Sequence, residues 1–349
     1  MAPNPAVGCV VVRTEGGQDR ILGRGWTQPG GRPHAETEAL ARAGAAAEGA
    51  TAYVSLEPCN HHGRTPPCSE ALIAAGIARV VAAMEDPDPR VAGSGLRRLR
   101  EAGLEAECGV CEEEAAWLNA GFLMRQRAGR PLVSLKTATT LDGRIAARSG
   151  ESQWITGAEA RARAHLMRAT HDAIMVGIGT ASVDDPSLTC RLPGLGQQSP
   201  IRIVVDARLR LPVAGTLVRT AREVPTWVIA LEGAEQARMD TLGAHGVEII
   251  PVPPGANGYP DPEKMLMALG ERGLTRVMVE GGATLAAALL RAKLVDRLAW
   301  FRSASVMGGD GIPAVEAYGV DRLALMARFA RRGIWRLGED VLETFDIRT

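Results

Sequence analysis

The residues His34-Ala35-Glu36 and, further along, Pro58-Cys59-Asn60-His61-His62-Gly63-Arg64-Thr65-Pro66-Pro67-Cys68 combine the side chains of a metal site. One imidazole and two thiolates form a ligand set that suits tetrahedral zinc. With three protein ligands the fourth position stays open to water, which is typical of a catalytic site rather than a structural one. The sequence therefore predicts a catalytic zinc site made of His34, Cys59 and Cys68.

Glu36 follows the histidine by two residues and is predicted to serve the metal site without binding the metal. Zinc lowers the pKa of a bound water from ~15.7 to about 7, and a neighbouring carboxylate can shuttle its protons. The order His-x-Glu, then Pro-Cys and a second Cys, is the pattern of zinc nucleobase deaminases, although their second Cys follows the first more closely. The alternative is a structural zinc site with His61 or His62 as its fourth ligand.

Composition limits the class of protein. The chain has 349 residues, enough for two domains, and its 40 Lys and Arg side chains balance 40 Asp and Glu. A neutral chain lacks an overall basic field for nucleic acid, and no apolar run is long enough to span a bilayer. We therefore expect a cytoplasmic protein with a small-molecule partner, no nucleic acid and no membrane. Cys108 and Cys111 form a C-x-x-C motif, but there is no second cysteine pair. We therefore expect two free cysteines that act as small buried apolar residues, rather than a redox or metal site.

Apolar patterning predicts strands that alternate with helices in the first part of the chain. Helices are expected over 35–47, 68–75, 94–101 and 112–126, and strands over 7–12, 21–26, 51–55, 79–83 and 104–107. This alternation favours a mainly parallel sheet covered by helices on both faces. His34 and Cys68 then stand at helix starts, where the helix dipole favours thiolates and other anions.

A linker is predicted over 127–131, which divides the chain into domains at 1–126 and 132–349. In the second domain we expect helices over 158–168, 262–271 and 283–291, and strands over 132–137, 173–176, 201–205, 226–230, 247–251, 276–280, 297–301 and 341–347.

Glu280-Gly281-Gly282 is the strongest ligand signal in this second domain, because it stands between a strand and a helix. Glycines let a phosphate approach the backbone, where free N–H groups at a helix start can bind it. A bare turn is the alternative. Gly177-Ile178-Gly179 begins a G-x-G-x-x-G motif without its third glycine, and a tight turn from strand to helix is the simpler interpretation.

These motifs, together with Asn4-Pro5-Ala6-Val7-Gly8, resemble those of the bifunctional deaminase–reductase family of riboflavin biosynthesis. The long insert between Cys59 and Cys68 separates this family from tRNA and cytidine deaminases. Similar family motifs continue over 136–144, 150–156, 184–189 and 279–285. The resemblance covers nearly the whole chain. It implies an α/β fold with an N-terminal cytidine-deaminase-like αβα domain and a C-terminal dihydrofolate-reductase-like α/β domain.

Two successive reactions are implied by the resemblance. A zinc-dependent step hydrolyses the 2-amino group from 2,5-diamino-6-(5-phosphoribosylamino)pyrimidin-4-one, and NADPH then reduces the ribosyl chain to give 5-amino-6-(5-phosphoribitylamino)uracil. The resemblance also implies a homo-oligomer, a dimer or a tetramer, formed through the second domain. Two alternatives stay open: a single-activity zinc nucleobase deaminase with a non-catalytic second domain, and a zinc-stabilised ligand sensor without turnover.

Matched motifs also assign individual residues. Glu36 and Asp184 are the expected catalytic residues, although Asp184 is equally suited to a cap or a turn. NADPH is expected to contact Ala138, Trp154, Thr180, Asp184, Gly282, Ala283, Thr284, Leu285, Ala286, Ala287 and Ala288. The substrates are expected to contact Asn4, His61, Arg64, Lys136, Ser152, Arg168, Leu188, Arg191 and Glu280. Arg168 and Arg191 suit a phosphate, which guanidinium groups bind bidentately, and plain surface positions are the alternative.

The start of the sequence departs from the family pattern. Family members have a helix before the motif that begins at Asn4, and this sequence leaves no room for one. We expect that the missing helix exposes a face of the sheet. A version extended upstream is then expected to show higher deaminase activity or a higher melting temperature.

Overall fold

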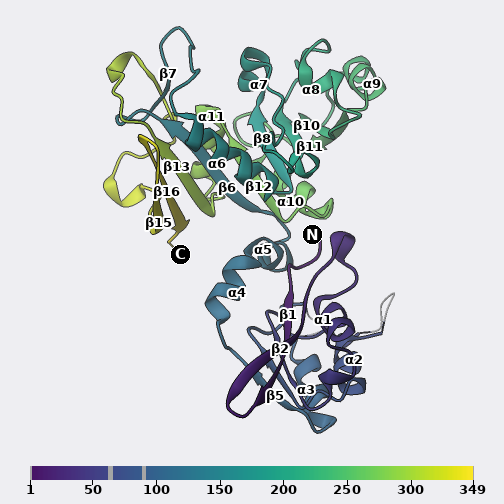
Figure 1. Cartoon of the computed structure of the whole chain (residues 1–349). Helices are drawn as coiled ribbons and strands as arrows, with labels where there is room; N and C mark the ends of the chain where they lie inside the picture. Colours follow the sequence, from purple (N-terminus) through teal and green to yellow (C-terminus); the bar gives the residue numbers. More distant parts are fainter. Residues whose placement is uncertain (1, 62–65, 89–91, 349) are drawn as a thin grey trace. The chain divides into compact units, whose positions relative to one another are not determined.

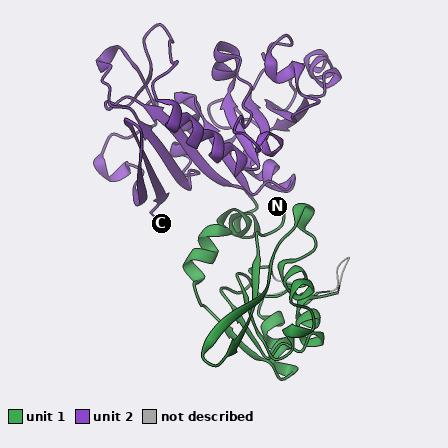
Figure 2. Cartoon of the chain, viewed as in Figure 1, with its two compact units in different colours: residues 1–129 green, residues 130–349 purple. Residues whose placement is uncertain are grey.

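The computed structural model describes residues 2–61, 66–88 and 92–348. The chain forms two compact units, residues 1–129 and 130–349, which Figure 2 shows in separate colours. Arg64 and His62, both singled out from the sequence, lie outside the described residues. No helix within the ranges just given is both long and apolar enough to cross a bilayer.

Unit 1 is built on a five-stranded sheet in the order β2-β1-β3-β4-β5 (Figure 1). Its strands are β1 (Gly8–Glu15), β2 (Gln18–Trp26), β3 (Thr51–Val54), β4 (Arg79–Ala82) and β5 (Glu105–Cys108). β1 pairs antiparallel with both β2 and β3, whereas β3, β4 and β5 are parallel. The sheet is therefore mixed rather than mainly parallel: the parallel part predicted from the sequence is β3, β4 and β5, and the reversed strand β1 adds two antiparallel pairs.

Five helices are described in unit 1. They are α1 (Ala35–Ala43), α2 (Cys68–Ala74), α3 (Ser94–Glu101), α4 (Glu112–Leu118) and α5 (Ala120–Ala128). Side chains of α1, α2 and α3 pack with Cys9 and Val11 of β1 in one core. Side chains of α4 and α5 form a separate cluster with Leu56 and Met84.

Two predicted helices differ from those in the structure: one is shorter, and the other is divided in two and ends at Ala128. Gly44 has a φ of 57° and ends α1, so that residues 44–47 form a separate 3₁₀ turn. The expected helix over 112–126 is broken at Asn119, which stands between α4 and α5 with φ −96° and ψ 11°. The Asn119 side chain accepts a hydrogen bond from the Ala6 amide at 2.9 Å and donates to the Ala6 carbonyl at 3.2 Å. The break thus anchors the segment that carries Asn4.

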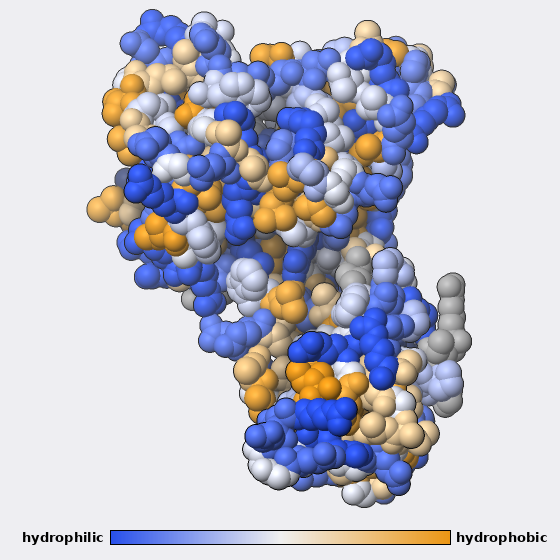
Figure 3. All heavy atoms as spheres, viewed as in Figure 1, coloured by the Kyte–Doolittle hydropathy of each residue, from blue (hydrophilic) through white to orange (hydrophobic). Residues whose placement is uncertain are grey.

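The face of the unit 1 sheet opposite α1–α3 is partly exposed. Val10 lies opposite Tyr53, and Val12 lies opposite Ile21, so these side chains share that face. Tyr53 and Ile21 are both exposed, and Figure 3 shows apolar side chains gathered on the visible face of unit 1.

Unit 2 contains a nine-stranded sheet in the order β11-β10-β9-β8-β12-β6-β13-β16-β15. Its strands are β6 (Leu132–Thr139), β8 (Ala173–Gly177), β9 (Ile201–Val205), β10 (Thr226–Leu231), β11 (Glu248–Val252), β12 (Arg276–Glu280), β13 (Arg297–Arg302), β15 (Phe329–Leu337) and β16 (Asp340–Ile347). The strands from β11 to β13 are parallel, and β16 and β15 add antiparallel pairs. A separate ribbon pairs β7 (Arg144–Ala146) with β14 (Ile312–Pro313).

The helices of unit 2 cover both faces of this sheet. They are α6 (Ala158–Ala169), α7 (Ile178–Asp184), α8 (Thr216–Arg219), α9 (Gln236–Ala244), α10 (Pro262–Glu271) and α11 (Ala283–Arg291). Alternate residues of β8 enter different cores: Met175 packs with α10 and α11, whereas Ile174 packs with α8 and α9. The carboxyl ends of the parallel strands β6, β8 and β12 meet at one edge, where ligands bind in open α/β sheets.

The boundary between the units lies just beyond α5. That helix runs to Ala128, so the first two residues of the predicted linker are helical, and Gly129 follows with a φ of 68°. Arg130 then donates to both carboxylate oxygens of Asp296, at 2.7 and 2.8 Å. This bidentate pair fastens the first residue of unit 2 to its own sheet, since Asp296 also accepts from the Val133 amide.

Candidate active sites

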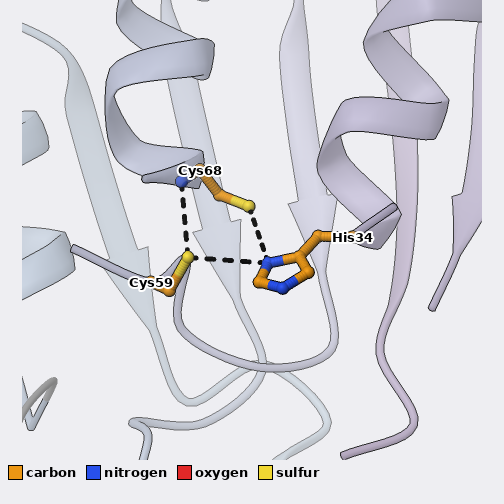
Figure 4. Close-up of side chains that lie close together, drawn as sticks. All are labelled: His34, Cys59 and Cys68. Atoms are coloured by element: carbon orange, nitrogen blue, oxygen red, sulfur yellow. Dashed lines mark hydrogen bonds between the residues drawn. The ribbon is translucent and has the colours of Figure 1, made fainter. Parts of the chain in front are cut away.

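Three side chains from separate elements of unit 1 converge on one point (Figure 4). His34 precedes α1, Cys59 lies in the loop after β3, and Cys68 is the first residue of α2. Their ligand atoms all lie within 4.8 Å of one another. The Nδ1 atom of His34 is 3.2 Å from the Cys68 sulfur and 3.5 Å from the Cys59 sulfur.

These distances fit zinc. Zn–S bonds of about 2.3 Å and Zn–N bonds of about 2.0 Å at tetrahedral angles separate nitrogen from sulfur by about 3.5 Å. Among the described residues, the cluster that could hold a metal consists of His34, Cys59 and Cys68 and does not include His61. The arrangement therefore favours an open, catalytic site over a structural site closed by His61.

The acid–base groups beside the cluster are strongly perturbed. Glu36, the second residue of α1, is only 4% exposed, and burial raises the pKa of its carboxyl to about 7. A carboxyl with a pKa near neutrality both accepts and returns protons readily. A hydrogen bond from the Cys68 thiol, aided by one from His34, lowers the pKa of the Cys59 thiol to about 4 against the effect of burial. The same hydrogen bond raises the pKa of the Cys68 thiol, so Cys59 is the thiolate of the pair and Cys68 holds the shared proton, which a bound cation would displace.

A cavity of about 260 Å³ adjoins the cluster. Its lining includes the predicted residues Asn4, His34, Glu36, Cys59 and His61. Glycine is favoured at position 31 by a φ of 86°, and a Cβ atom there would lie 2.2 Å from the Asn4 side-chain nitrogen and displace it. The Nδ1 atom of His61 is buried without a hydrogen-bond partner, which leaves it available to a ligand.

Sequence analysis missed several residues of this cavity, among them Arg32, Glu57, Asp86, Asp88 and Arg125. Asp86 and Asp88 follow β4, a strand that is parallel to β3 and β5, and could have been found from their place at its carboxyl end. Burial raises the pKa of Asp86 to about 6, and the neighbouring carboxylates Asp88 and Glu57 add to the effect.

Unit 2 has its own cavity, of about 570 Å³, at the carboxyl edge of β6, β8 and β12. The structure brings the following predicted residues to its lining: Lys136, Ala138, Ser152, Trp154, Arg168, Thr180, Asp184, Leu188, Arg191, Glu280, Gly282, Ala283 and Ala286. Four predicted cofactor residues on α11 do not line it. Leu285 and Ala287 are buried, Ala288 is half-buried, and Thr284 donates to the Glu316 carboxylate at 2.9 Å.

A charged cluster occupies the floor of this cavity. Lys136 donates to one oxygen of Glu280 at 2.9 Å, and Arg168 donates to the other at 3.0 Å. Burial alone would raise the pKa of Glu280, but the two cations together lower it to about 2. Glu280 is therefore ionised throughout the physiological range and holds both cations in place.

The neighbouring Gly281 and Gly282 have φ values of 91° and 87°, a region that favours glycine. They lead into the first turn of α11, whose backbone N–H groups suit a phosphate. Asp184, which also lines the cavity, ends α7, and partial burial raises its pKa. The cap on α8 comes from Asp185 instead, whose carboxylate accepts from the Thr216 amide at 2.6 Å.

Comparison with known proteins identifies both units. The model of the RibD C-terminal domain matches residues 131–342, and that of the cytidine and deoxycytidylate deaminase zinc-binding region matches residues 1–84. The riboflavin biosynthesis protein RibD of Escherichia coli is 43% identical over 97% of this chain and 92% of its own length. RibD of Aquifex aeolicus is 40% identical, over 98% of this chain and 92% of its own length.

Solved structures agree with the sequence matches. RibD of Acinetobacter baumannii, in its form 1, superposes with a TM-score of 0.87 at 37% identity, covering 99% of this chain and 93% of that one. A diaminohydroxyphosphoribosylaminopyrimidine deaminase/5-amino-6-(5-phosphoribosylamino)uracil reductase from Thermotoga maritima has a TM-score of 0.86 at 33% identity, with the same coverage. These findings confirm the predicted fold of each domain and do not support a single-activity deaminase. The chain belongs to the RibD family of riboflavin biosynthesis, whose members join a zinc-binding deaminase domain to a reductase domain.

Proposed function

We propose that unit 1 deaminates 2,5-diamino-6-(5-phosphoribosylamino)pyrimidin-4-one and that unit 2 reduces the ribosyl chain of the product with NADPH. One observation carries the proposal: a single chain holds a His–Cys–Cys cluster beside the buried Glu36 in one unit and a cation-lined cavity in the other. The Thermotoga maritima relative is named for both activities, which supports the same pair of reactions in this chain.

In unit 1, His34, Cys59 and Cys68 would hold zinc, which when bound supplies Lewis-acid activation of water. Glu36 would accept a proton from that water, then deliver protons to the ring nitrogen and to the departing amine. The C–N bond breaks, a C–O bond replaces it, and ammonia leaves. Asn4 and His61 line the same cavity and would orient the pyrimidine, and Arg64 stays a prediction.

In unit 2, the backbone at Gly281 and Gly282 would receive a phosphate of NADPH, which supplies a hydride when bound. Ala138, Trp154 and Thr180 line the same cavity and would contact the cofactor. Asp184 would orient the opened sugar or protonate it as the hydride arrives.

The substrate side of the unit 2 cavity is the more strongly charged. Lys136, Arg168 and Glu280 form an ionic cluster in its lining, and Arg191 is an exposed residue of the same lining. Guanidinium groups suit a phosphate, so Arg168 and Arg191 would hold the phosphate of the substrate. Lys136, Glu280, Ser152 and Leu188 would contact the rest of its ribosyl chain and ring.

We also propose a homo-oligomer formed through unit 2. β15 is the last strand of the nine-stranded sheet, and its side chains Ile334 and Trp335 are exposed. An edge strand with exposed apolar side chains readily pairs with another chain. The molar mass by light scattering checks this, and a monomeric mass would contradict it.

A coupled assay tests the two reactions. The zinc-loaded protein is given the diamino substrate and NADPH, and ammonia and NADPH absorbance are followed together. We expect ammonia to appear first and NADPH consumption to follow with a lag. NADPH oxidation without prior ammonia release would contradict the proposed order, and no ammonia release would contradict the deaminase assignment.

A further inference from the structure

His165 lies on the unit 2 cavity but has no part in the sites assigned above. It stands three residues before Arg168 on α6, so the two side chains project from neighbouring turns of the same helix face. Opposite them runs the segment 187–191, which supplies Leu188 and Arg191 to the cavity lining.

Two side chains of α6 contact this segment at a single backbone carbonyl. The Thr189 oxygen lies 3.1 Å from the Nδ1 atom of His165, and Arg168 donates to the same oxygen at 3.0 Å. The Nδ1 atom of His165 also lies 3.3 Å from the Arg191 amide. His165 therefore contacts the backbone of Thr189 and of Arg191, the two residues that flank Cys190.

The segment needs such an anchor because its backbone is strained. Leu188 has a φ of 53°, a left-handed conformation that is strained for a non-glycine residue. The bend turns the Leu188 side chain inward, where it is buried. It also lets the Arg191 guanidinium donate to the Ser187 hydroxyl at 2.7 Å across the turn.

The charge state of the ring suits this role. Burial lowers the pKa of His165, and the nearby cations Arg168 and Arg191 lower it further. The ring is therefore neutral at pH 7. A neutral imidazole carries one proton, so its Nδ1 atom either donates to the Thr189 carbonyl or accepts from the Arg191 amide.

We propose that His165 is a positioning residue for substrate binding in unit 2, because it fixes the segment 187–191 and with it Arg191. The inference rests on the proposed reductase function of that unit. In this role His165 does not touch the reacting atoms. It holds the Arg191 side chain at the same cavity as Arg168, so that both can receive one anionic group of the substrate.

Two variants separate positioning from simple structural support. Asparagine places its side-chain amide close to the position of Nδ1 and can make either hydrogen bond, so His165→Asn is the matched control. Leucine has similar bulk and makes neither bond. We expect His165→Leu to raise the KM for 5-amino-6-(5-phosphoribosylamino)uracil about fivefold to tenfold, the effect of one lost hydrogen bond. The kcat and the NADPH affinity are expected to stay near the wild-type values, and His165→Asn is expected to restore the KM.

Binding of ribose 5-phosphate, measured by calorimetry in the presence of NADP⁺, gives a readout that does not depend on turnover. It is expected to weaken by the same factor in His165→Leu and to recover in His165→Asn. An unchanged KM and affinity in His165→Leu would overturn the inference, as would an equal loss in both variants. If wild-type protein binds ribose 5-phosphate but does not oxidise NADPH with the uracil, the proposed reaction fails while the role of His165 is still decided by binding.

Discussion

Burial disfavours the charged form of two titratable side chains of unit 2, Glu280 and His171, but only Glu280 has neighbouring charges that reverse the effect. The pKa of Glu280 falls to about 2 because Lys136 and Arg168 outweigh the effect of burial, so the charged form is favoured. The pKa of His171 falls to about 4 chiefly through burial, so the neutral form is favoured. The ring of His171 lies between the Met167 carbonyl, at 2.7 Å, and the Ser134 hydroxyl, at 3.0 Å.

His171 therefore makes the stability of unit 2 depend on pH. Between its ordinary pKa of 6.5 and its folded value of about 4, the unfolded chain binds more protons than the folded one, so stability is lost as the pH falls. The loss approaches about 3 kcal/mol by pH 4. His171→Gln can still reach Ser134 but does not titrate, and we expect its urea-unfolding free energy to fall less between pH 7 and pH 4.5. Identical pH slopes for the two proteins would show that His171 is not the source.

The role of a residue was predictable from the sequence where its own side chain performs that role, as a metal ligand does. His34, Cys59 and Cys68 are recognisable as ligands, and the structure brings them together. Glu57 and His165 were not predictable, because each acts through backbone groups distant in sequence. Every residue type has backbone polar groups, so the sequence does not reveal which residues such a side chain will bind.

At the scale of elements, the bounds could be predicted where capping residues, proline or glycine mark the end of a helix or strand. The bounds of α3, α10, α11, β9 and β12 agree with those expected from the sequence. Asp261 explains one of them: its carboxylate accepts from the Glu263 and Lys264 amides, at 2.9 and 3.0 Å, and Pro262 follows it. α8 and β15 were not predicted from the sequence. α8 spans only four residues, and β15 has arginines among its apolar residues, so neither shows a clear periodic pattern.

α3 depends on a side chain outside the helix. It has no acidic residue in its first turn and no side-chain cap of its own. Glu57, from the loop after β3, supplies the missing carboxylate. One of its oxygens accepts from the Gly95 and Leu96 amides, and the other accepts from the Gly93 and Asp86 amides, all at 2.8–3.1 Å.

Replacing Glu57 by alanine leaves these four amides without their acceptor in a buried setting. We expect Glu57→Ala to lower the free energy of unfolding of unit 1 by about 3 kcal/mol, since each buried donor left unpaired costs about 1–3 kcal/mol. Urea unfolding measures the change. Glu101→Ala, an exposed position at the other end of α3, is the matched control and should change the free energy little. A loss no larger than that of the control would contradict the capping role of Glu57.

The whole molecule joins two sites that are each built within one unit. The cavity beside the metal cluster is lined by residues between Pro3 and Gln126, and the second cavity by residues between Leu135 and Glu316. The family resemblance, which rested on motifs in both halves of the sequence, is confirmed by relatives that match 97–98% of the chain. That prediction rested on motif spacing, because each half of the sequence contains the ligand-binding residues of its own site.

The most direct test of this two-site account is the variant Glu36→Gln, assayed for zinc content, ammonia release and NADPH consumption. Glutamine keeps the shape of the side chain but cannot take up the proton, and the reductase cavity is built from other residues. The account predicts about one zinc per chain, no ammonia from the diamino substrate, and wild-type NADPH oxidation when 5-amino-6-(5-phosphoribosylamino)uracil is supplied. Ammonia release at the wild-type rate by this zinc-loaded variant would contradict it.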